Sequence, residues 1–585
     1  MKILLTLAAL APLLASAATA EIKTASLANL VGVDHLGRKI VEFEETGPRK
    51  PKRIVGLFYY LWLGQHGARG PWDITKMEQL DPEVMDKPDS PLWPDMSRTP
   101  TLHWGEPLWG YYVSTDEWVL RRQIEMFINA GIDVLYFDTT NGYHYREVTD
   151  KLFALLQEYH DRGYKVPKFC YYMAPARRGC GTSNVVDVWN NYYKDRKYSD
   201  LYFMWDGKPL MITHPDRQYK QEIWEFFTFR RPTWGTPDKP DTWYWSGMPE
   251  QNVAVSSKGE REMLPVTVAT PHVSPKSPDK ENAGWNLGSS EIHWRKDMQS
   301  RSWNETEGRR DERPDATHRG AFFQCQIDWA LAKEREDVPV AFICQWNEWI
   351  SPTLTKATND MFGRMPHWLI MMDECNMEAS RDIEPMKGGF MDAYYLQMVN
   401  FVRRWKGLDA PAAADRTYAF AADDLDAWRE VSPAYAEMTG DCAPRNSPGY
   451  GGVVYKNNTG RNEFKLLKTA VVGDQLAFYA ETVKPLSPAT DKNWMELFLK
   501  VPGAKPDAMG YTHRLSRNTA GVKCVYRGNR LAYFVPAGQL GIDLTKPVRL
   551  EFKWSDNRQA DDVMDFYLNG DAAPRGRLNW LFLKR

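Results

Sequence analysis

The sequence is poor in cysteine and histidine and carries almost no net charge. Among 585 residues there are seven cysteines and 11 histidines, and no two cysteines have the spacing of a structural zinc site. Cys442 and Cys524 could form a disulfide in an exported protein. With 74 basic and 76 acidic residues the formal net charge is −2, which argues against nucleic acid or an anionic membrane as partner. The sequence therefore predicts no metal, no other cofactor and no nucleic-acid-binding function.

Long apolar stretches are absent after the first 20 residues. Residues 1–20 combine a basic start at Lys2, an apolar run over residues 3–14 and small residues at 18–20, which is typical of a cleavable signal peptide. No later stretch is long enough to cross a bilayer. We therefore expect a secreted or periplasmic monomer with no membrane partner. A short N-terminal anchor is the alternative interpretation of the same segment.

Aromatic residues are the abundant class. The sequence has 24 tryptophans and 28 tyrosines, a composition that suits a protein whose binding subsites are lined by aromatic rings. A tryptophan-rich core would give the same counts. Composition alone therefore leaves both interpretations open.

The first four hundred residues alternate apolar strand patterns with amphipathic helix patterns. Apolar runs of the kind found in doubly buried strands predict seven strands and a weaker eighth. These are residues 53–63, 132–138, 168–173, 209–212, 242–245, 264–269 and 340–344, with the eighth near 371–373. No glycine-rich phosphate loop follows any of them, so the repeated units predict an α/β fold, a (β/α)8 TIM barrel over residues 21–407, rather than an open sheet.

After a linker-like stretch at residues 408–416 the pattern changes to short alternating strands. Residues 473–474 (Gly-Asp) and 528–529 (Gly-Asn) separate such runs as two-residue hairpin turns. Residues 417–585 therefore predict an all-β antiparallel sandwich. A calcium ion (Ca2+) is compatible with such a sandwich, although no acid-rich loop requires one.

Glu348 lies in an aromatic and amide-rich sequence directly after the strand predicted at residues 340–344. The residues that follow this strand are Gln345, Trp346, Asn347, Glu348 and Trp349. Active sites of (β/α)8 barrels form at the carboxyl ends of the strands, so a carboxylate here lies where a sugar ring could bind between indoles. We predict that Glu348 is catalytic, as base or nucleophile. The alternative is a glutamate that pairs with an arginine beneath a tryptophan-rich core.

Glycoside cleavage ordinarily needs a second carboxyl group, roughly 5 Å away for retention of configuration and roughly 6.5–9.5 Å for inversion. Asp138, at the end of the second predicted strand, is the first candidate; orienting substrate or capping a loop is its alternative role. Glu106, on the long loop after the first strand, is the second, and a loop-stabilising ion pair explains it equally well. Asp382 and Glu384 follow Arg381 directly, which favours a structural network of carboxylates with arginine.

Polar and aromatic residues near the predicted strand ends are candidate sugar-binding residues. Indole and phenol rings stack on the C–H faces of sugars, while amide and imidazole groups bind hydroxyls. The candidates are Tyr59, Tyr60, Trp62, His66, His103, Trp104, Asn141, His144, Trp245, His272, Trp346, Asn347 and Trp349. Each aromatic residue among them could instead be a core residue.

Five short sequences occur in one order over residues 50–407, and together they resemble the bacterial glycoside hydrolase family 71/99-like proteins. They are residues 58–62 (FYYLW), 103–107 (HWGEP), 133–138 (DVLYFD), 345–349 (QWNEW) and 380–389 (SRDIEPMKGG). The resemblance implies a (β/α)8 barrel and a retaining or related hydrolysis of glycans. Residues 431–435 and 493–498 are similar to parts of a family 9 type carbohydrate-binding sandwich, which implies an accessory domain.

One residue departs from the pattern of the family 99 endo-α-mannosidases. Their motif is Asn-Glu-Trp-His-Glu, with a second carboxylate three residues after the first. Here Glu348 matches the first carboxylate, but Ser351 occupies the second position, and a serine cannot replace a carboxylic acid as proton donor at neutral pH. The specific mannosidase activity is therefore not implied.

The sequence thus predicts a secreted glycoside hydrolase that cleaves a poly- or oligosaccharide by a carboxylate mechanism centred on Glu348. One alternative is a glycan-binding barrel that has lost catalysis, which Ser351 would explain. A further alternative is a polysaccharide lyase that uses tyrosine or histidine with arginine. A hydrolase would release new reducing ends, a binder would leave the glycan intact, and a lyase would leave an unsaturated product.

Overall fold

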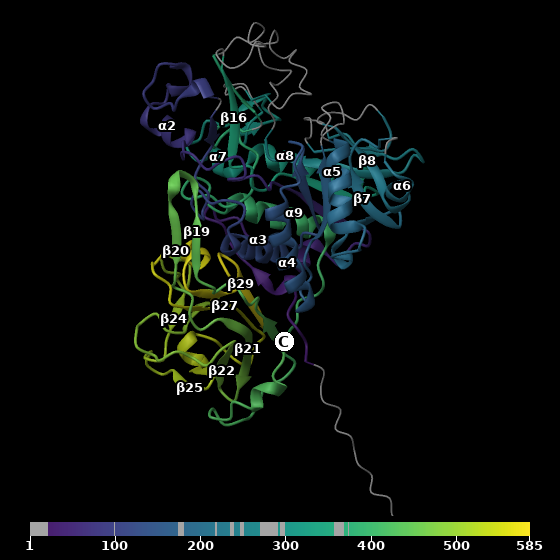
Figure 1. Ribbon diagram of the computed structural model, residues 1–585. Coiled ribbons are helices and arrows are strands. Elements are labelled where there is room, and N and C mark those ends of the chain that lie inside the picture. The colour runs from purple at the N-terminus through teal and green to yellow at the C-terminus, as the bar shows by residue number, and fades with distance from the viewer. Residues whose placement is uncertain are drawn as a thin grey trace, which may run out of the picture.

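The computed structural model describes residues 22–98, 100–173, 181–216, 219–233, 239–245, 251–269, 291–292, 299–355, 368–372 and 374–585. The expected signal peptide at residues 1–20 and the candidate residue His272 lie outside these ranges. Figure 1 shows a region of mixed helices and strands above a region made mostly of strands. Within the described ranges, no helix has both the length and the apolar character needed to cross a membrane.

Eight parallel strands form a barrel-shaped sheet. They are β2 (Ile54–Tyr59), β4 (Val134–Thr139), β5 (Lys168–Met173), β7 (Lys208–Ile212), β8 (Thr228–Thr233), β9 (Thr242–Tyr244), β11 (Arg261–Thr267) and β15 (Val340–Cys344). Neighbours in this order pair in parallel, except β9 and β11, and β15 pairs back onto β2. The parallel sheet predicted for the first four hundred residues is confirmed.

A short antiparallel strand bridges the remaining gap in the wall. β10 (Ala254–Val255) pairs with β11, and the carbonyl oxygen of Val255 accepts a 2.9 Å hydrogen bond from the N–H of Asp241, just before β9. The ring of strands is therefore continuous, and the carboxyl ends of its eight parallel strands lie at one end of the barrel.

The prediction of the eighth barrel strand was wrong. The residues near 371–373 contribute instead to a separate antiparallel sheet. Its strands are β3 (Thr101–His103), β12 (Glu291–Ile292), β16 (Ile350–Thr355) and β17 (Leu369–Met372). The barrel strand that prediction missed is β8, in which Arg230 is buried and donates from Nε to Glu262 of β11 at 2.7 Å. A buried charge interrupts the apolar run that identifies such strands, and its buried partner makes the charge tolerable.

Helices cover the barrel between its strands (Figure 1). They and the remaining short helices are α1 (Phe43–Thr46), α2 (Ile74–Leu80), α3 (Glu117–Ala130), α4 (Arg146–Asp161), α5 (Gly181–Val188), α6 (Gln221–Phe226), α7 (Ala316–Arg319), α8 (Ala321–Ala330), α9 (Ala393–Lys406) and α10 (Asp565–Leu568). α3 illustrates why they form, because Leu120, Ile124 and Phe127 make one buried stripe. Gly131 then ends the helix in the left-handed region, at φ +77°.

Two antiparallel sheets make up most of the C-terminal region. The strands of the first sheet are β18 (Ala434–Ala436), β21 (Phe464–Val472), β22 (Gln475–Thr482), β26 (Arg530–Pro536) and β25 (Lys523–Arg527). The strands of the second sheet are β1 (Leu30–Val31), β29 (Asn579–Lys584), β27 (Val548–Asp556), β28 (Asp571–Ala573), β23 (Glu496–Lys500) and β24 (His513–Leu515). The rings of Phe478 in the first sheet and Phe552 in the second lie 6.2 Å apart. The predicted turns at residues 473–474 and 528–529 are confirmed, between β21 and β22 and between β25 and β26.

The C-terminal region also receives a strand from the other end of the chain, because β1 pairs with β29.

Cys442 and Cys524 are free thiols, so the disulfide considered from the sequence is not formed. Cys524 lies in β25, opposite Tyr533 of β26. The backbone of Cys442 packs instead against Gly460, where an added Cβ would lie 2.2 Å from the Cys442 carbonyl oxygen.

A hairpin projects from the C-terminal region towards the barrel (Figure 1). Its strands, β19 (Arg445–Pro448) and β20 (Val454–Asn457), pair only with each other among the described strands. The turn between them, residues 449–453, contains three glycines. This hairpin reaches the same end of the barrel as α2, which follows the first barrel strand (Figure 1).

Candidate functional site

Glu348 and Asp138 lie at the carboxyl ends of β15 and β4. Only β2 separates these strands, so their backbones are about 10 Å apart. Both residues are buried, with exposed fractions of 2% and 1%. Burial raises the pKa of Tyr145, and the negative charges of Asp138 and Glu348 raise it further. The charges of the two acids selected from the sequence therefore both act on one phenol.

Glu348 is held through both its side chain and its backbone. Its Oε2 accepts a 2.8 Å hydrogen bond from Gln345 Nε2, and the guanidinium of Arg381 lies 4.0 Å from the same oxygen. The backbone N–H of Glu348 donates to Asp382 Oδ1 at 2.5 Å. The arginine that the alternative interpretation of Glu348 requires is thus present beside it, and the carboxylate is fixed in place.

A third acid, Glu374, shares a donor with Glu348. Nε2 of Gln345 lies 2.5 Å from Glu374 Oε1 and 2.8 Å from Glu348 Oε2, so these two oxygens are at most 5.3 Å apart. Glu374 Oε2 accepts a 2.8 Å hydrogen bond from the N–H of Arg381. Burial raises the pKa of Glu374 well above its usual range, and the charge of Asp382 adds to this effect, while Arg381 opposes it. Burial therefore disfavours the charged form of Glu374.

Three predicted sugar-binding indoles, those of Trp104, Trp346 and Trp349, are fully buried. Trp104 and Trp349 stack with ring centroids 4.3 Å apart. Nε1 of Trp104 donates to Asp382 Oδ2 at 2.9 Å and to the carbonyl oxygen of Glu348 at 3.0 Å. These indoles hold the backbone around Glu348 from within the core and present no ring face to solvent.

The carboxylate of Glu384 accepts hydrogen bonds from four buried side chains. The donors are Trp109 Nε1 at 2.9 Å, Tyr112 Oη at 2.8 Å, Gln123 Nε2 at 2.5 Å and Trp349 Nε1. Burial raises the pKa of Glu384 to about 7, although these hydrogen bonds act in the opposite direction. The network predicted around Glu384 is therefore built with indole, phenol and amide donors instead of arginine.

Asn347 joins the ends of β15 and β2. Its Oδ1 accepts a 2.9 Å hydrogen bond from the N–H of Tyr60, and its Nδ2 donates to the carbonyl oxygen of Tyr60 at 3.1 Å. Tyr60 Oη donates in turn to Gln345 Oε1 at 2.8 Å. Tyr59 points to α3, where its Oη donates to Gln123 at 2.6 Å. Asn347 and Tyr60 thus position the loop that carries Glu348, and Tyr59 packs between the barrel and its helices.

The exposed part of the candidate site is a cluster of rings around His66. Its Nε2 lies 3.1 Å from Tyr145 Oη. The rings of Trp62, Tyr143 and Tyr145 meet the imidazole edge-on, with centroids 6.2, 5.5 and 5.6 Å away. Tyr143 is 59% exposed, and Asn141 Nδ2 donates to Tyr145 Oη at 3.4 Å. Because these rings lie on the loops that follow β2 and β4, they form an aromatic surface at the same end of the barrel as the carboxylates.

Sequence reasoning missed Tyr143, Tyr145 and Glu374. Both tyrosines belong to the segment Asn-Gly-Tyr-His-Tyr, which begins three residues after Asp138. Tyr145 adopts a left-handed backbone conformation, at φ +46°, where the loop turns into α4. Glu374 follows the strand predicted near residues 371–373. The rule that selected Asp138, a polar residue at the end of a strand, could have found all three.

Trp245 and Glu106 have partners of their own. The guanidinium of Arg381 lies 4.6 Å from the ring centroid of Trp245, which is 3% exposed. Glu106 binds Lys76 Nζ at 2.5 Å and Lys387 Nζ at 3.0 Å. Burial alone would raise the pKa of Glu106, but its hydrogen bonds to the two lysines outweigh this and lower it. The structure thus places Glu106 in a loop-stabilising ion pair, formed with lysines.

His103, His144 and Ser351 lie in local packing environments. His103 is buried, with the rings of Tyr111 and Tyr450 at centroid distances of 4.9 and 4.5 Å. Burial lowers the pKa of His103 to about 3, so its ring is neutral. His144 is half-buried, and burial lowers its pKa as well. Ser351 is buried in β16, where its Oγ lies 3.2 Å from the carbonyl oxygen of Pro352.

Two further places in the described part of the chain could be expected to hold a ligand. Among the described residues, Asp441, Cys442 and Glu463 have potential metal ligand atoms within 4.8 Å of one another. Asp441, however, is ion-paired with the buried guanidinium of Arg575, which disfavours a second cation there.

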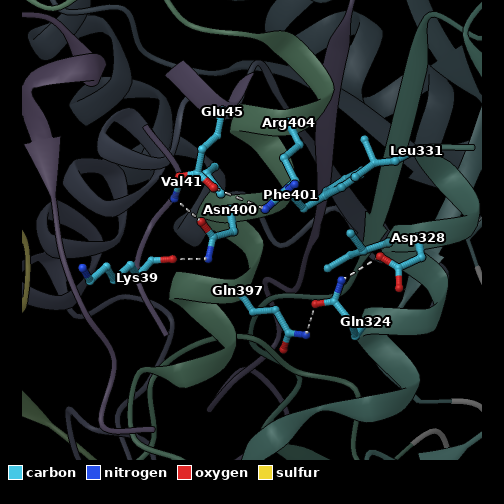
Figure 2. Close-up of a pocket in the computed structure, with 11 residues that line it drawn as sticks. Lys39, Val41, Glu45, Gln324, Asp328, Leu331, Gln397, Asn400, Phe401 and Arg404 are labelled. Atoms are coloured by element: carbon cyan, nitrogen blue, oxygen red, sulfur yellow. Dashed lines mark hydrogen bonds and ion pairs between the residues drawn. The ribbon is translucent and has the colours of Figure 1, made fainter. Parts of the chain in front are cut away.

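Figure 2 shows the other place, a surface pocket of about 410 Å³ formed by the N-terminal segment, α8 and α9. Its polar groups bind one another: Gln397 Nε2 donates to Gln324 Oε1 at 3.1 Å, and Asn400 Nδ2 donates to the carbonyl oxygen of Lys39 at 3.2 Å. Its two acids, Glu45 of α1 and Asp328 of α8, lie on helices and not at strand ends, so the strand ends remain the candidate site.

Comparisons with known proteins place few constraints on the chain. No family model and no curated protein matches the sequence. Two similar solved structures are of the GH99 endo-alpha-mannosidase from Bacteroides thetaiotaomicron, one of them in complex with BIS-TRIS-propane. Each is 15% identical to this chain; the matches cover 60% of this chain and 97% and 98% of theirs, with TM-scores of 0.32 and 0.31. The chemistry of the site follows below from its own residues.

We expect Glu384→Leu to destabilise the fold strongly. The variant leaves four buried donors without their acceptor, and the free energy of unfolding should fall by more than about 3 kcal/mol. Urea unfolding followed by tryptophan fluorescence measures the change. Glu117→Leu is the matched control because Glu117 forms an exposed ion pair with Arg121, and it should cost less than about 1 kcal/mol. Equal effects in the two variants would contradict the role of Glu384.

His103 should make the protein less stable in acid. Its pKa is about 3 when folded, against an ordinary value of 6.5, so between these values the unfolded chain binds a proton that the folded chain does not. The stability contributed above pH 6.5 is lost as the pH falls towards 3, by about 2 kcal/mol between pH 7 and pH 5. Urea unfolding of wild type and His103→Gln at both values tests this. An unchanged pH dependence in the variant would refute it.

Proposed function

We propose that this chain is a glycoside hydrolase that cleaves glycosidic bonds in a poly- or oligosaccharide. The observation that carries the proposal is that two buried strand-end carboxyl groups, those of Glu348 and Asp138, lie at the same end of the barrel on strands separated only by β2. An exposed aromatic surface lies on the loops at that end, as recognition of a sugar ring requires.

Glu348 acts at the anomeric carbon, as nucleophile or as the base that activates water. Gln345 and Arg381 hold its carboxylate. Asp138 is the second carboxyl group, and it protonates the leaving oxygen. Glu374 takes no direct part in the reaction, because both of its carboxylate oxygens already accept hydrogen bonds, one from Gln345 and one from the N–H of Arg381. It is a positioning residue for Glu348.

The ring surface around His66 binds the sugar. Tyr143 offers an exposed ring face, and Asn141 and His66 offer polar groups for hydroxyls. The chain works as an exported monomer without a cofactor, and its two C-terminal sheets form a β-sandwich of the carbohydrate-binding type. The buried indoles of Trp104, Trp346 and Trp349 belong to the support of the site.

Specific observations favour each of the other two functions. Ser351 stands where a second carboxylate is expected, which favours a glycan-binding barrel without catalysis. The pair formed by His66 and Tyr145, 3.1 Å apart, contains the residue types that a polysaccharide lyase uses. A rise in ultraviolet absorbance on incubation with uronic polysaccharides would reveal a lyase, and binding without new reducing ends on any glycan would reveal a binder.

Glu348→Gln should abolish turnover while keeping the fold. The amide preserves the shape of the side chain but can act neither as base nor as nucleophile, so kcat should fall by about 10³-fold or more. Products from neutral, sulfated and uronic polysaccharides, separated by chromatography, give the rates. Glu374→Gln is the matched control, since Glu374 is a second buried carboxyl group on the same amide of Gln345 and has no direct part in the proposed reaction, and it should lower kcat by no more than about tenfold. Retained turnover in Glu348→Gln would refute the assignment.

Asp138→Asn should affect substrates according to their leaving group. A natural glycan needs a proton on the departing oxygen, so its hydrolysis should slow by about 10²-fold or more. An aryl glycoside with a dinitrophenolate leaving group needs no proton and should be cleaved at close to the wild-type rate for bond breaking. Comparing the two substrates isolates the proton transfer. Equal losses on both would remove Asp138 from the role of acid.

A further inference from the structure

The β19–β20 hairpin of the C-terminal region is bound to the loop that carries His66. The N–H of Gly64 donates to Tyr450 Oη at 2.8 Å, and the N–H of Gly451 donates to the carbonyl oxygen of Ala68 at 2.8 Å. A Cβ on Gly451, whose φ is +71°, would lie 2.2 Å from the carbonyl oxygen of Gly70. The tip of the hairpin and residues 64–70 are therefore in direct backbone contact on both sides of His66.

The hairpin is itself anchored to the barrel at its base. Arg445 forms a buried ion pair with Asp116, the residue before α3, at 2.7 Å, and its Nη1 donates to the carbonyl oxygen of Trp109 at 2.9 Å. The N–H of Tyr111 donates to Tyr455 Oη at 2.8 Å. Both strands of the hairpin are thus fixed, so the hairpin can hold the loop it touches.

The loop transmits this contact to the candidate acids. It turns tightly, because the N–H of Gln65 donates to the carbonyl oxygen of Trp62 at 2.9 Å and the N–H of Gly67 donates to that of Gly64 at 3.2 Å. His66 lies inside these turns and contacts Tyr145 at 3.1 Å. Tyr145 is also the phenol whose pKa the charges of the two carboxylates raise. A displacement of Gly64 therefore moves His66 and alters the surroundings of Tyr145.

We infer that the C-terminal hairpin is a fixed wall of the active site and that Tyr450 is a positioning residue, acting on His66 and Tyr145 through Gly64. The inference deepens the proposed function and rests on it for its effect on catalysis. The positioning of His66 by Tyr450, however, exists in the protein without substrate and can be measured there. The C-terminal region thus contributes to the active site of its own chain. Any binding of glycan by its sheets would be a separate role.

The test compares Tyr450→Phe with Tyr418→Phe in the full chain. Tyr418 is the matched control, because its Oη also accepts a backbone N–H, that of Ser432 at 3.1 Å, but it lies in the first C-terminal sheet region away from the hairpin. The primary readout is the ¹³Cε1–¹H signal of His66 in labelled protein without substrate, assigned with His66→Gln. Tyr450→Phe should shift this signal, and Tyr418→Phe should leave it in place.

Kinetics provide the second readout once a cleaved glycan is known. Tyr450→Phe should lower kcat/KM by about tenfold through misplacement of His66 and Tyr145, and Tyr418→Phe should leave it within about twofold of wild type. Gly451→Ala, which forces a methyl group against Gly70, should shift the His66 signal as well. An unchanged His66 signal in both hairpin variants would overturn the inference. A shifted signal in a protein that cleaves no glycan would leave the positioning intact and refute only the proposed function.

Discussion

The arrangement at the strand ends depends on the burial of more carboxyl groups than cations. Glu348, Glu374 and Asp382 lie around Arg381, and all three acids are shielded from solvent. Arg381 and the buried Arg301 favour the charged forms, but burial raises the pKa of Asp382 to about 6 and that of Glu374 well above its usual range. Burial therefore disfavours the charge on these two acids, while Gln345 and Arg381 hold the carboxylate of Glu348.

The same constraint decides where the tryptophans go. A buried carboxyl group needs donors, and the indole N–H groups of Trp104 and Trp349 supply them to Asp382 and Glu384. These indoles are therefore committed to the core, although in the sequence they look like sugar platforms. Solvent-facing rings come from the loop after β4 instead, where Tyr143 lies. The number of aromatic residues in a sequence thus does not distinguish indoles that support a buried acid from rings that bind a sugar, because both lie beside an acid.

The barrel could be predicted where its strands are continuous apolar runs, as β4 and β15 are. β8 escaped because Arg230 finds its partner Glu262 on another strand, a contact that a local pattern cannot contain. The residues of the candidate site likewise divide into those that a local sequence pattern identifies and those that it does not. Glu348 and Asp138 follow from their position at the ends of strands, whereas Glu374 is joined to Glu348 only by the side chain of Gln345. The sequence alone therefore does not identify residues whose role depends on a contact with a residue far away in the chain.

The segment between the barrel and the C-terminal sheets determines how freely these two regions can move relative to each other. Residues 408–416 have the composition of a flexible linker, but the N–H of Ala414 binds the carbonyl oxygen of Leu583 at 2.8 Å, and the N–H of Ala412 binds Asn29 Oδ1 at 3.0 Å. A segment fixed in this way cannot let a binding module range freely over a polymer. With the hairpin fixed to the barrel as well, the C-terminal region acts at one orientation, so any glycan that its sheets bind must approach the strand ends along a path set by the fold.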